Sequence, residues 1–298
     1  MLGIGGGGDV VGGLAVARTL EALGTPFVLG GVSWERIAID PRPGPRAIAH
    51  VRNARALGPT AALAGPATAT SEGIAFCEAR MAEHLGVETV LIDPSEGAIG
   101  AAAGMAAAAD ELGCDLVVSV DVGGDVLARG RERGLASPLC DAVMVAAALR
   151  ASRGLTQLLA VVGPGCDGEL SVAEVLERTA DLGQAGAWIG TWGVTPQIAE
   201  ELRAAAAIVP TEASLQVARC AAGETGEAPI RGGRRRAELG PVGALVFLFD
   251  PVAAPAEKLP LVRAVSGTRS IEEARRALAE LGVRTELDYE RSRAGEGP

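Results

Sequence analysis

The most constraining feature of this sequence is a repeated unit in which a short apolar run ends in a turn of glycine and aspartate. In the clearest copy, residues 117–125, a β-branched run passes through Asp121 into Gly123, Gly124 and Asp125. Such a run is typical of a buried parallel strand, and the glycine pair indicates a sharp turn after it. The unit therefore places Asp121 at the carboxyl end of a strand and Asp125 just beyond the turn.

Helical patterns separate these apolar runs along the chain. Residues 10–23 and 98–112 are predicted helices that stop at Gly24 and Gly113. Strands that alternate with helices indicate βαβ crossovers and a mainly parallel sheet. We therefore expect an α/β fold, specifically a Rossmann-like three-layer α/β/α arrangement around a mainly parallel sheet.

No shift in composition divides the chain into parts. Its 298 residues, 48% of them hydrophobic, are enough for one large core. We expect a single α/β domain over residues 1–291, an irregular insertion at about 36–71 and a disordered tail at 292–298. The insertion holds several prolines and has no strong period, which is typical of a lid or a binding loop.

Charge and hydropathy narrow the set of partners. A net charge of −10 disfavours nucleic acid, because an acidic chain repels a phosphate backbone. Glycine or charge interrupts the apolar stretches before the ~20 residues that cross a bilayer, and residues 1–13 lack the basic region of a signal peptide. We expect a cytoplasmic protein with a small-molecule ligand and neither a nucleic-acid nor a membrane partner; a homo-oligomer is left open.

The strand-end turns predict where that ligand binds. In a parallel sheet the carboxyl ends of the strands share one edge, and ligands bind in the crevice where the strand order reverses. Glycine allows close approach to the backbone, and helix N-termini attract anions. The turns expected at this edge are residues 5–9, 30–35, 93–97, 121–125, 163–169, 190–193 and Asp250.

Aspartates in these turns are the candidate chemical groups. Asp9, Asp121, Asp125 and Asp167 should converge, with Asp141 nearby on the following helix. Three interpretations stay open: the acids hold Mg²⁺ or Ca²⁺, they bind sugar hydroxyls with one acting as general base, or they only cap helices. We predict Asp121 and Asp125 as the catalytic pair and as candidate metal ligands.

Further residues are predicted to bind the ligand. Ser33, Trp34 and Glu35 could contact a ring and a hydroxyl, although a buried turn is the alternative, and Thr191 has a similar balance. The basic run at residues 231–236 is a candidate anion contact, or else a solvated loop. The full predicted ligand-binding set is Gly5, Gly6, Gly7, Gly8, Asp9, Ser33, Trp34, Glu35, Gly123, Gly124, Asp141, Gly165, Asp167 and Thr191.

Motifs for well-known cofactors are weak or absent. Gly3, Gly5 and Gly8 formally match the dinucleotide fingerprint, but the second strand ends in residues 30–32 without the expected acid. Lys258 is the only lysine, so a P-loop is excluded, and no nucleophile elbow for a catalytic serine is present. The cofactor is therefore left unknown, with Mg²⁺ as a candidate and NAD(P) disfavoured.

Several long motifs in fixed order resemble one family. They are residues 3–12, 30–36, 40–45, 121–125 and 137–142. Together they resemble the uncharacterised family called domain of unknown function 1152, and the resemblance covers most of the chain. It implies one structural unit and supplies no activity.

These observations lead to one functional hypothesis and two alternatives. We expect an enzyme of hydrolase, lyase or transferase type that acts on a nucleoside, nucleotide or sugar-like metabolite through aspartates in a glycine-loop crevice. A non-catalytic ligand-binding or sensor protein would use the same crevice. An NAD(P)-dependent oxidoreductase is the third hypothesis.

Overall fold

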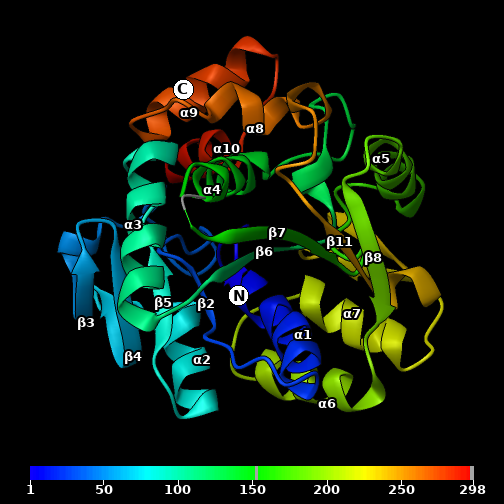
Figure 1. Ribbon diagram of the computed structural model, residues 1–298, viewed down its shortest axis with the longest axis horizontal. Coiled ribbons are helices and arrows are strands. Elements are labelled where there is room, and N and C mark those ends of the chain that lie inside the picture. Colours follow the sequence, from blue (N-terminus) through cyan, green and yellow to red (C-terminus); the bar gives the residue numbers. More distant parts are fainter. Residues whose placement is uncertain (152–153, 296–298) are drawn as a thin grey trace.

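A computed structural model describes residues 1–151 and 154–295 of the chain (Figure 1). Within this part, nine strands form one sheet in the order β3-β4-β5-β2-β1-β6-β7-β11-β8, and β9 pairs with β10 in a separate hairpin. The strands are β1 (Leu2–Gly3), β2 (Gly30–Val32), β3 (Val51–Gly58), β4 (Ala61–Thr70), β5 (Thr89–Ile92), β6 (Leu116–Val122), β7 (Thr156–Val162), β8 (Trp188–Gly193), β9 (Gly226–Ile230), β10 (Arg235–Leu239) and β11 (Leu245–Phe249).

The five central strands, β5-β2-β1-β6-β7, are parallel. Their first strand lies in the middle, with the second and third central strands on one side and the fourth and fifth on the other, which is the Rossmann order. Nearly all side chains of β5 and β6 are buried, as expected for strands covered on both faces. The predicted Rossmann-like α/β fold is confirmed, and the sheet is mixed only toward its two edges.

Helices cover both faces of this sheet (Figure 1). One face carries α3, α4, α5, α8, α9 and α10, and the other carries α1, α2, α6 and α7. The helices are α1 (Asp9–Ala22), α2 (Cys77–Leu85), α3 (Gly97–Leu112), α4 (Pro138–Ala151), α5 (Val172–Gln184), α6 (Pro196–Ala206), α7 (Ala213–Ala221), α8 (Pro260–Val265), α9 (Ile271–Glu280) and α10 (Glu286–Ala294).

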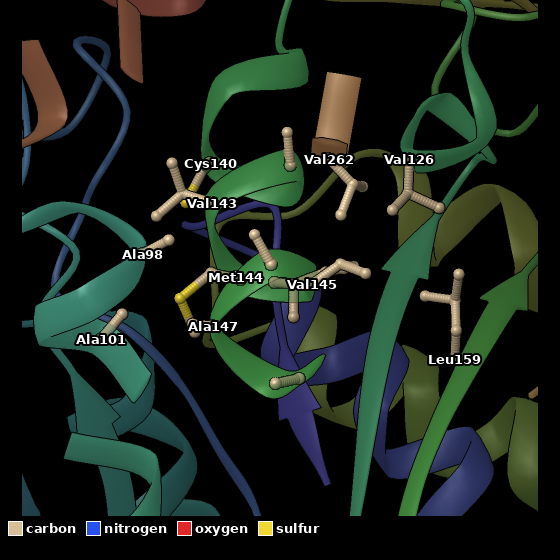
Figure 2. Close-up of a cluster of buried hydrophobic side chains, with 14 of the residues drawn as sticks. Ala98, Ala101, Val126, Cys140, Val143, Met144, Val145, Ala147, Leu159 and Val262 are labelled. Atoms are coloured by element: carbon tan, nitrogen blue, oxygen red, sulfur yellow. The ribbon is translucent and has the colours of Figure 1, made fainter. Parts of the chain in front are cut away.

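Helix α4 is buried on all sides, and this burial holds its first turn in place. Its side chains pack in one cluster with Ala98 and Ala101 of α3, Leu159 of β7 and Val262 of α8 (Figure 2). Small alanines on α3 let the two helices approach closely, in keeping with the dense packing of protein interiors. The first turn of α4 carries Asp141, which is only 1% exposed.

The prediction of an irregular insertion at residues 36–71 was wrong for the second half of this range. Residues 51–70 form the antiparallel strands β3 and β4, and β4 pairs with β5. The inner half of β4 consists of three alanines and a leucine, and alanine is a poor strand former in isolation. Most of the remaining residues of β3 and β4 are exposed or half-buried, so neither strand shows the alternation that would reveal it.

The other end of the sheet also departs from the sequence prediction. Strand β11 runs antiparallel to β7, so Asp250 lies at the edge opposite the other strand-end turns. Residues 190–193, predicted as a turn, lie within β8, which pairs with β11. The reason is that tertiary pairing with β11 extends a strand that is only a brief apolar run in sequence.

The predicted disordered tail was partly wrong. Helix α10 continues to Ala294 and begins with a capping box between Thr285 and Asp288. Residues 296–298 of the predicted tail lie outside the described residues. Within the residues that are described, no helix combines the length and apolarity needed to cross a membrane.

Candidate functional site

A cavity of about 1030 Å³ opens at the point where the strand order of the sheet reverses. Strand β1 lies between β2 and β6, and the turns that follow β1 and β6 contribute to its lining. These turns are the Gly5–Gly8 loop, which leads into α1, and the segment after Val122. In open α/β sheets this crevice is the general ligand position.

Three aspartates meet beside this cavity, and two of them, Asp9 and Asp141, line it directly. Asp9 begins α1, Asp121 lies in β6, and Asp141 lies in the first turn of α4. One carboxylate oxygen from each lies within 4.8 Å of the others. The predicted convergence of these residues is confirmed, and we call them the switch-point trio.

Gly5 shapes the approach to the switch-point trio. Its main-chain N–H donates to Asp9 Oδ2 at 3.0 Å. A Cβ atom at this position would lie 2.4 Å from the same oxygen and 3.3 Å from Asp141 Oδ1. Any residue larger than glycine would therefore displace the carboxylates.

The switch-point trio is not neutralised by the groups around it. Asp121 Oδ2 and Asp141 Oδ1 are buried and have no hydrogen-bond partner among the described residues. Burial raises the pKa of Asp9 to about 6, against a smaller opposing effect of Arg36. Burial, and then the charge of Asp9, raises the pKa of Asp121 to about 8. Like charges this close must be relieved by protons or by a cation.

A second group of acids lies beside the first. Asp125, Asp167 and Glu169 also have one carboxylate oxygen each within a mutual 4.8 Å, and we call them the hairpin trio. The carboxyl groups of Asp121 and Asp125 affect each other's pKa values, which links the two trios electrostatically. Gly123 lets them meet, because a Cβ atom there would lie 2.1 Å from Asp167 Cγ.

Glu169 differs from the other acids of the two trios, because hydrogen bonds and an ion pair satisfy its carboxylate. It accepts hydrogen bonds from the main-chain N–H of Ala136 and Ser137 at 2.7 and 2.9 Å, and it pairs with Arg235 at 2.6 Å. Although burial acts to raise the pKa of Glu169, Arg235 and Ser137 outweigh it and lower that pKa. Burial raises the pKa values of Asp125 and Asp167, and neighbouring carboxylates add to the effect.

Arginine side chains contribute the positive charge of the cavity. Arg36 donates to the main-chain carbonyl of Gly5, lies 5.6 Å from the ring centroid of Trp34, and approaches Glu286 to 3.7 Å. The remaining arginines that line the cavity are Arg231, Arg234, Arg235 and Arg284. An apolar wall at residues 37–39 completes the lining.

Most of the predicted site residues are brought together. Asp121 lies in the switch-point trio, while Gly123 and Gly124 form the turn beside it and Gly165 lies in the same loop as Asp167. Those that line the cavity directly are Gly5, Gly6, Gly7, Gly8, Asp9, Asp125, Asp141 and Asp167.

Eight predicted site residues lie outside the cavity lining. Four of them, Asp121, Gly123, Gly124 and Gly165, belong to the acidic trios or to the turns beside them, and the other four do not. Ser33 and Trp34 are fully buried; Ser33 Oγ donates to a main-chain carbonyl at 2.6 Å, and Trp34 Nε1 donates to Glu290 at 3.0 Å. Glu35 accepts from the main-chain N–H of Cys77 at 2.6 Å. These three form the buried turn that was the alternative interpretation.

Thr191 is the fourth of these residues. It lies in β8, where its hydroxyl accepts a hydrogen bond from Trp188 Nε1 at 3.2 Å. Strand β8 is the last strand of the sheet, remote from the switch point at β1 and β6. The expectation of a ligand contact at Thr191 came from placing a turn where the strand continues.

Sequence reasoning missed several groups that line the cavity. Glu286, Tyr289 and Glu290 come from α10, far along the chain from every strand-end turn. No short motif marks them, because their place depends on where α10 docks. The basic run that supplies Arg235 was the one available signal, and it indicated an anion contact rather than a partner for Glu169.

Comparison with known proteins places the chain in a family without assigning an activity. No curated protein and no solved structure matches it. The family described as "Protein of unknown function (DUF1152)" matches residues 1–294. The motifs around the glycine loop and the aspartates fall within this match. The chain therefore belongs to the DUF1152 family.

Proposed function

We propose that this protein is an enzyme that acts on a small polar metabolite, a nucleoside, nucleotide or sugar-like compound, with a divalent cation held by the switch-point trio. One observation carries the proposal. Asp121 and Asp141 each have a buried oxygen without a hydrogen-bond partner among the described residues, and they belong to a cluster of three carboxylates of which Asp9 and Asp141 line a large cavity. Buried carboxylates of this kind need a counter-charge, and no arginine pairs with them among the described residues.

Mg²⁺ suits this donor set. It prefers oxygen ligands, binds through a small number of carboxylates, and keeps several waters that can contact a substrate. A bound cation would polarise a substrate oxygen or activate a water molecule. Asp125 lines the cavity beside Asp121 and is placed to exchange a proton with the substrate. Hydrolysis, elimination and group transfer all fit these roles.

A dinucleotide cofactor fits the same loop less well. The glycines that formally match the fingerprint do lie between a strand and a helix, at β1 and α1. However, the Asp9 carboxylate turns back onto the Gly5 N–H, at the loop where a Rossmann fold holds the pyrophosphate. Its negative charge would repel a pyrophosphate held directly by the loop amides without a bridging cation, and residues 30–32 lack the acid that would bind the ribose, so we disfavour NAD(P).

Calorimetric titration of the purified protein with Mg²⁺ and Mn²⁺ tests the cation site. We expect saturable binding that Asp121→Asn weakens at least 100-fold, about 2.7 kcal/mol, because it removes one of three charged ligands. Asp110→Asn, a change at an exposed aspartate at the end of α3, is the matched control and should bind as the parent does. Equal binding by the Asp121→Asn protein would refute the cation site.

Catalysis needs a separate test from binding. A screen of nucleosides, nucleotides and sugar phosphates should reveal Mg²⁺-dependent turnover that Asp125→Asn abolishes while the melting temperature stays within a few degrees. Tight binding of one of these compounds without turnover would instead support the sensor hypothesis. Turnover of NAD(P)H without a cation would support the oxidoreductase.

A further inference from the structure

Three arginines at the cavity form no ion pair with any residue that the structure describes. Arg231 and Arg234 flank the turn of the β9–β10 hairpin, and Arg284 precedes α10. The positive charges of these three arginines therefore face a cavity in which several carboxyl groups interact with one another.

Two other arginines of the same hairpin do form ion pairs. Arg235 pairs with the buried Glu169 at 2.6 Å, and Arg236 pairs with Glu227 on the exposed face at 3.1 Å. An arginine of this hairpin therefore forms an ion pair where a carboxylate faces it. Arg231 and Arg234 lie toward the cavity without such a carboxylate, although the chain as a whole carries an excess of acids.

Arg231 is held in place at a cost in backbone energy. Its φ of 55° lies in the left-handed region, where the Cβ atom of any residue other than glycine strains the backbone. Its main-chain N–H donates to Glu212 at 2.7 Å, so the turn is anchored independently of the side chain. The charge of Arg231 reaches Asp9, whose pKa it helps to lower against the larger effect of burial.

Arg234 is also positioned by specific contacts. Its guanidinium lies 5.7 Å from the ring centroid of Tyr289 and donates to the hydroxyl of that residue. Tyr289 lines the cavity as well. The tyrosine therefore restrains the guanidinium at the cavity without neutralising its charge.

We propose that the substrate carries a phosphate group, which Arg231, Arg234 and Arg284 bind while the cation at the switch-point trio holds a second of its oxygens. Guanidinium groups match the oxygens of a phosphate in charge and geometry. The cavity volume of about 1030 Å³ leaves room for a sugar or nucleoside against the apolar wall at residues 37–39. The inference rests on the proposed function, and it narrows the substrate to a phosphate ester.

Nucleotides and sugar phosphates share this chemistry, so the experiment separates them. The parent protein with Mg²⁺ is titrated with pyrophosphate, ADP, ribose 5-phosphate, adenosine and ribose. We expect the phosphorylated compounds to bind at least 10-fold more tightly than their uncharged counterparts. ADP as the tighter ligand identifies a nucleotide substrate, and ribose 5-phosphate as the tighter ligand identifies a sugar phosphate.

Two arginine variants test the assignment to these side chains. Arg231→Gly removes the charge and relieves the left-handed strain, so it should fold well and bind pyrophosphate at least 10-fold more weakly. Arg284→Ala changes an exposed residue and should weaken binding in the same direction. Arg236→Ala, on the outer face of the same hairpin, is the control and should bind as the parent does.

Two results would overturn the inference. One is that adenosine or ribose binds as tightly as its phosphorylated form, and the other is that both arginine variants bind pyrophosphate normally. The experiments distinguish failure of the phosphate proposal from failure of the proposed cation site. Mg²⁺ binding without phosphate binding would leave the proposed cation in place and remove only the phosphate. Phosphate binding without Mg²⁺ binding would remove the cation and keep the arginines.

Discussion

The two acidic trios lie side by side and contain the same number of carboxylates, yet they are built differently. In the hairpin trio, Glu169 accepts two main-chain hydrogen bonds and pairs with Arg235. In the switch-point trio, Asp121 and Asp141 each keep a buried oxygen that has no hydrogen-bond partner within residues 1–151 and 154–295. One trio contains a charge that an arginine neutralises, whereas the charge of the other must be relieved by protons or by a cation.

This difference separates Glu169, whose charge is satisfied within the fold, from the acids of the switch-point trio, which we propose bind a cation. A buried carboxylate that is hydrogen-bonded and paired is retained as part of the structure, and removal of its partner is costly. A buried carboxylate without partners lowers stability while the site is empty. Breaking the Glu169–Arg235 pair and neutralising an acid of the switch-point trio should therefore change stability in opposite directions.

The largest effect on stability should come from breaking the hairpin trio. Arg235→Ala leaves the buried Glu169 without its cationic partner, and we expect the free energy of unfolding to fall by about 3 kcal/mol. Urea unfolding at pH 7 measures it. Arg236→Ala removes an exposed pair on the same strand and should cost less than about 0.5 kcal/mol. Equal losses in the two variants would contradict the assignment of a buried, necessary pair.

Neutralisation in the switch-point trio should have the opposite sign. Without a cation at pH 8, Asp121→Asn removes like-charge repulsion, and its amide can donate to a neighbouring carboxylate. We expect a gain of about 1–2 kcal/mol in unfolding free energy. Added Mg²⁺ should stabilise the parent protein and have little effect on the variant. A destabilised variant that still responds to Mg²⁺ would show that Asp121 is structural.

The pH dependence of the cation-free protein should follow from the raised pKa values. Asp9 and Asp121 titrate near 3.8 when unfolded and at about 6 and about 8 when folded, so the folded state holds more protons between these values. Their contribution to stability is present at low pH and is lost as the pH rises through 6 and then 8. We expect the melting temperature to fall by ~5 °C from pH 5.5 to 8.5.

A cation should reverse this trend, because it competes with protons for the same oxygens. The rise in melting temperature on adding Mg²⁺ should be larger at pH 8 than at pH 6. Glu169 has the opposite sign, since its lowered pKa contributes stability that is lost on acidification below its unfolded value of 4.5. A Mg²⁺ effect independent of pH would argue against binding at the switch-point trio.

The smallest effect should come from the hydroxyl that supports Glu169. Ser137 Oγ donates to Glu169, whose remaining partners stay in place when this group is removed. We expect Ser137→Ala to lower the unfolding free energy by about 1 kcal/mol, measured by urea unfolding. A loss as large as that of Arg235→Ala would mean that the hydroxyl, rather than the ion pair, holds Glu169.

Much of the fold follows from local patterns in the chain. The apolar run of β6 and the glycine turn after it predicted both the strand and the place of Asp121. Strands β3 and β4 escaped prediction, because alanine-rich and half-exposed strands lack an alternating pattern. The antiparallel direction of β11 was not predicted either, since periodicity identifies a strand without indicating which way it runs in the sheet.

The pattern of acidic, glycine-rich turns after parallel strands was enough to predict that Asp9, Asp121 and Asp141 meet at one edge of the sheet. Which of the acids are neutralised could be learned only from the folded chain. The partner of Glu169 comes from a hairpin that begins more than fifty residues later, and α10 arrives from near the end of the chain. Local patterns depend on neighbours in sequence, whereas the balance of buried charge depends on neighbours in space.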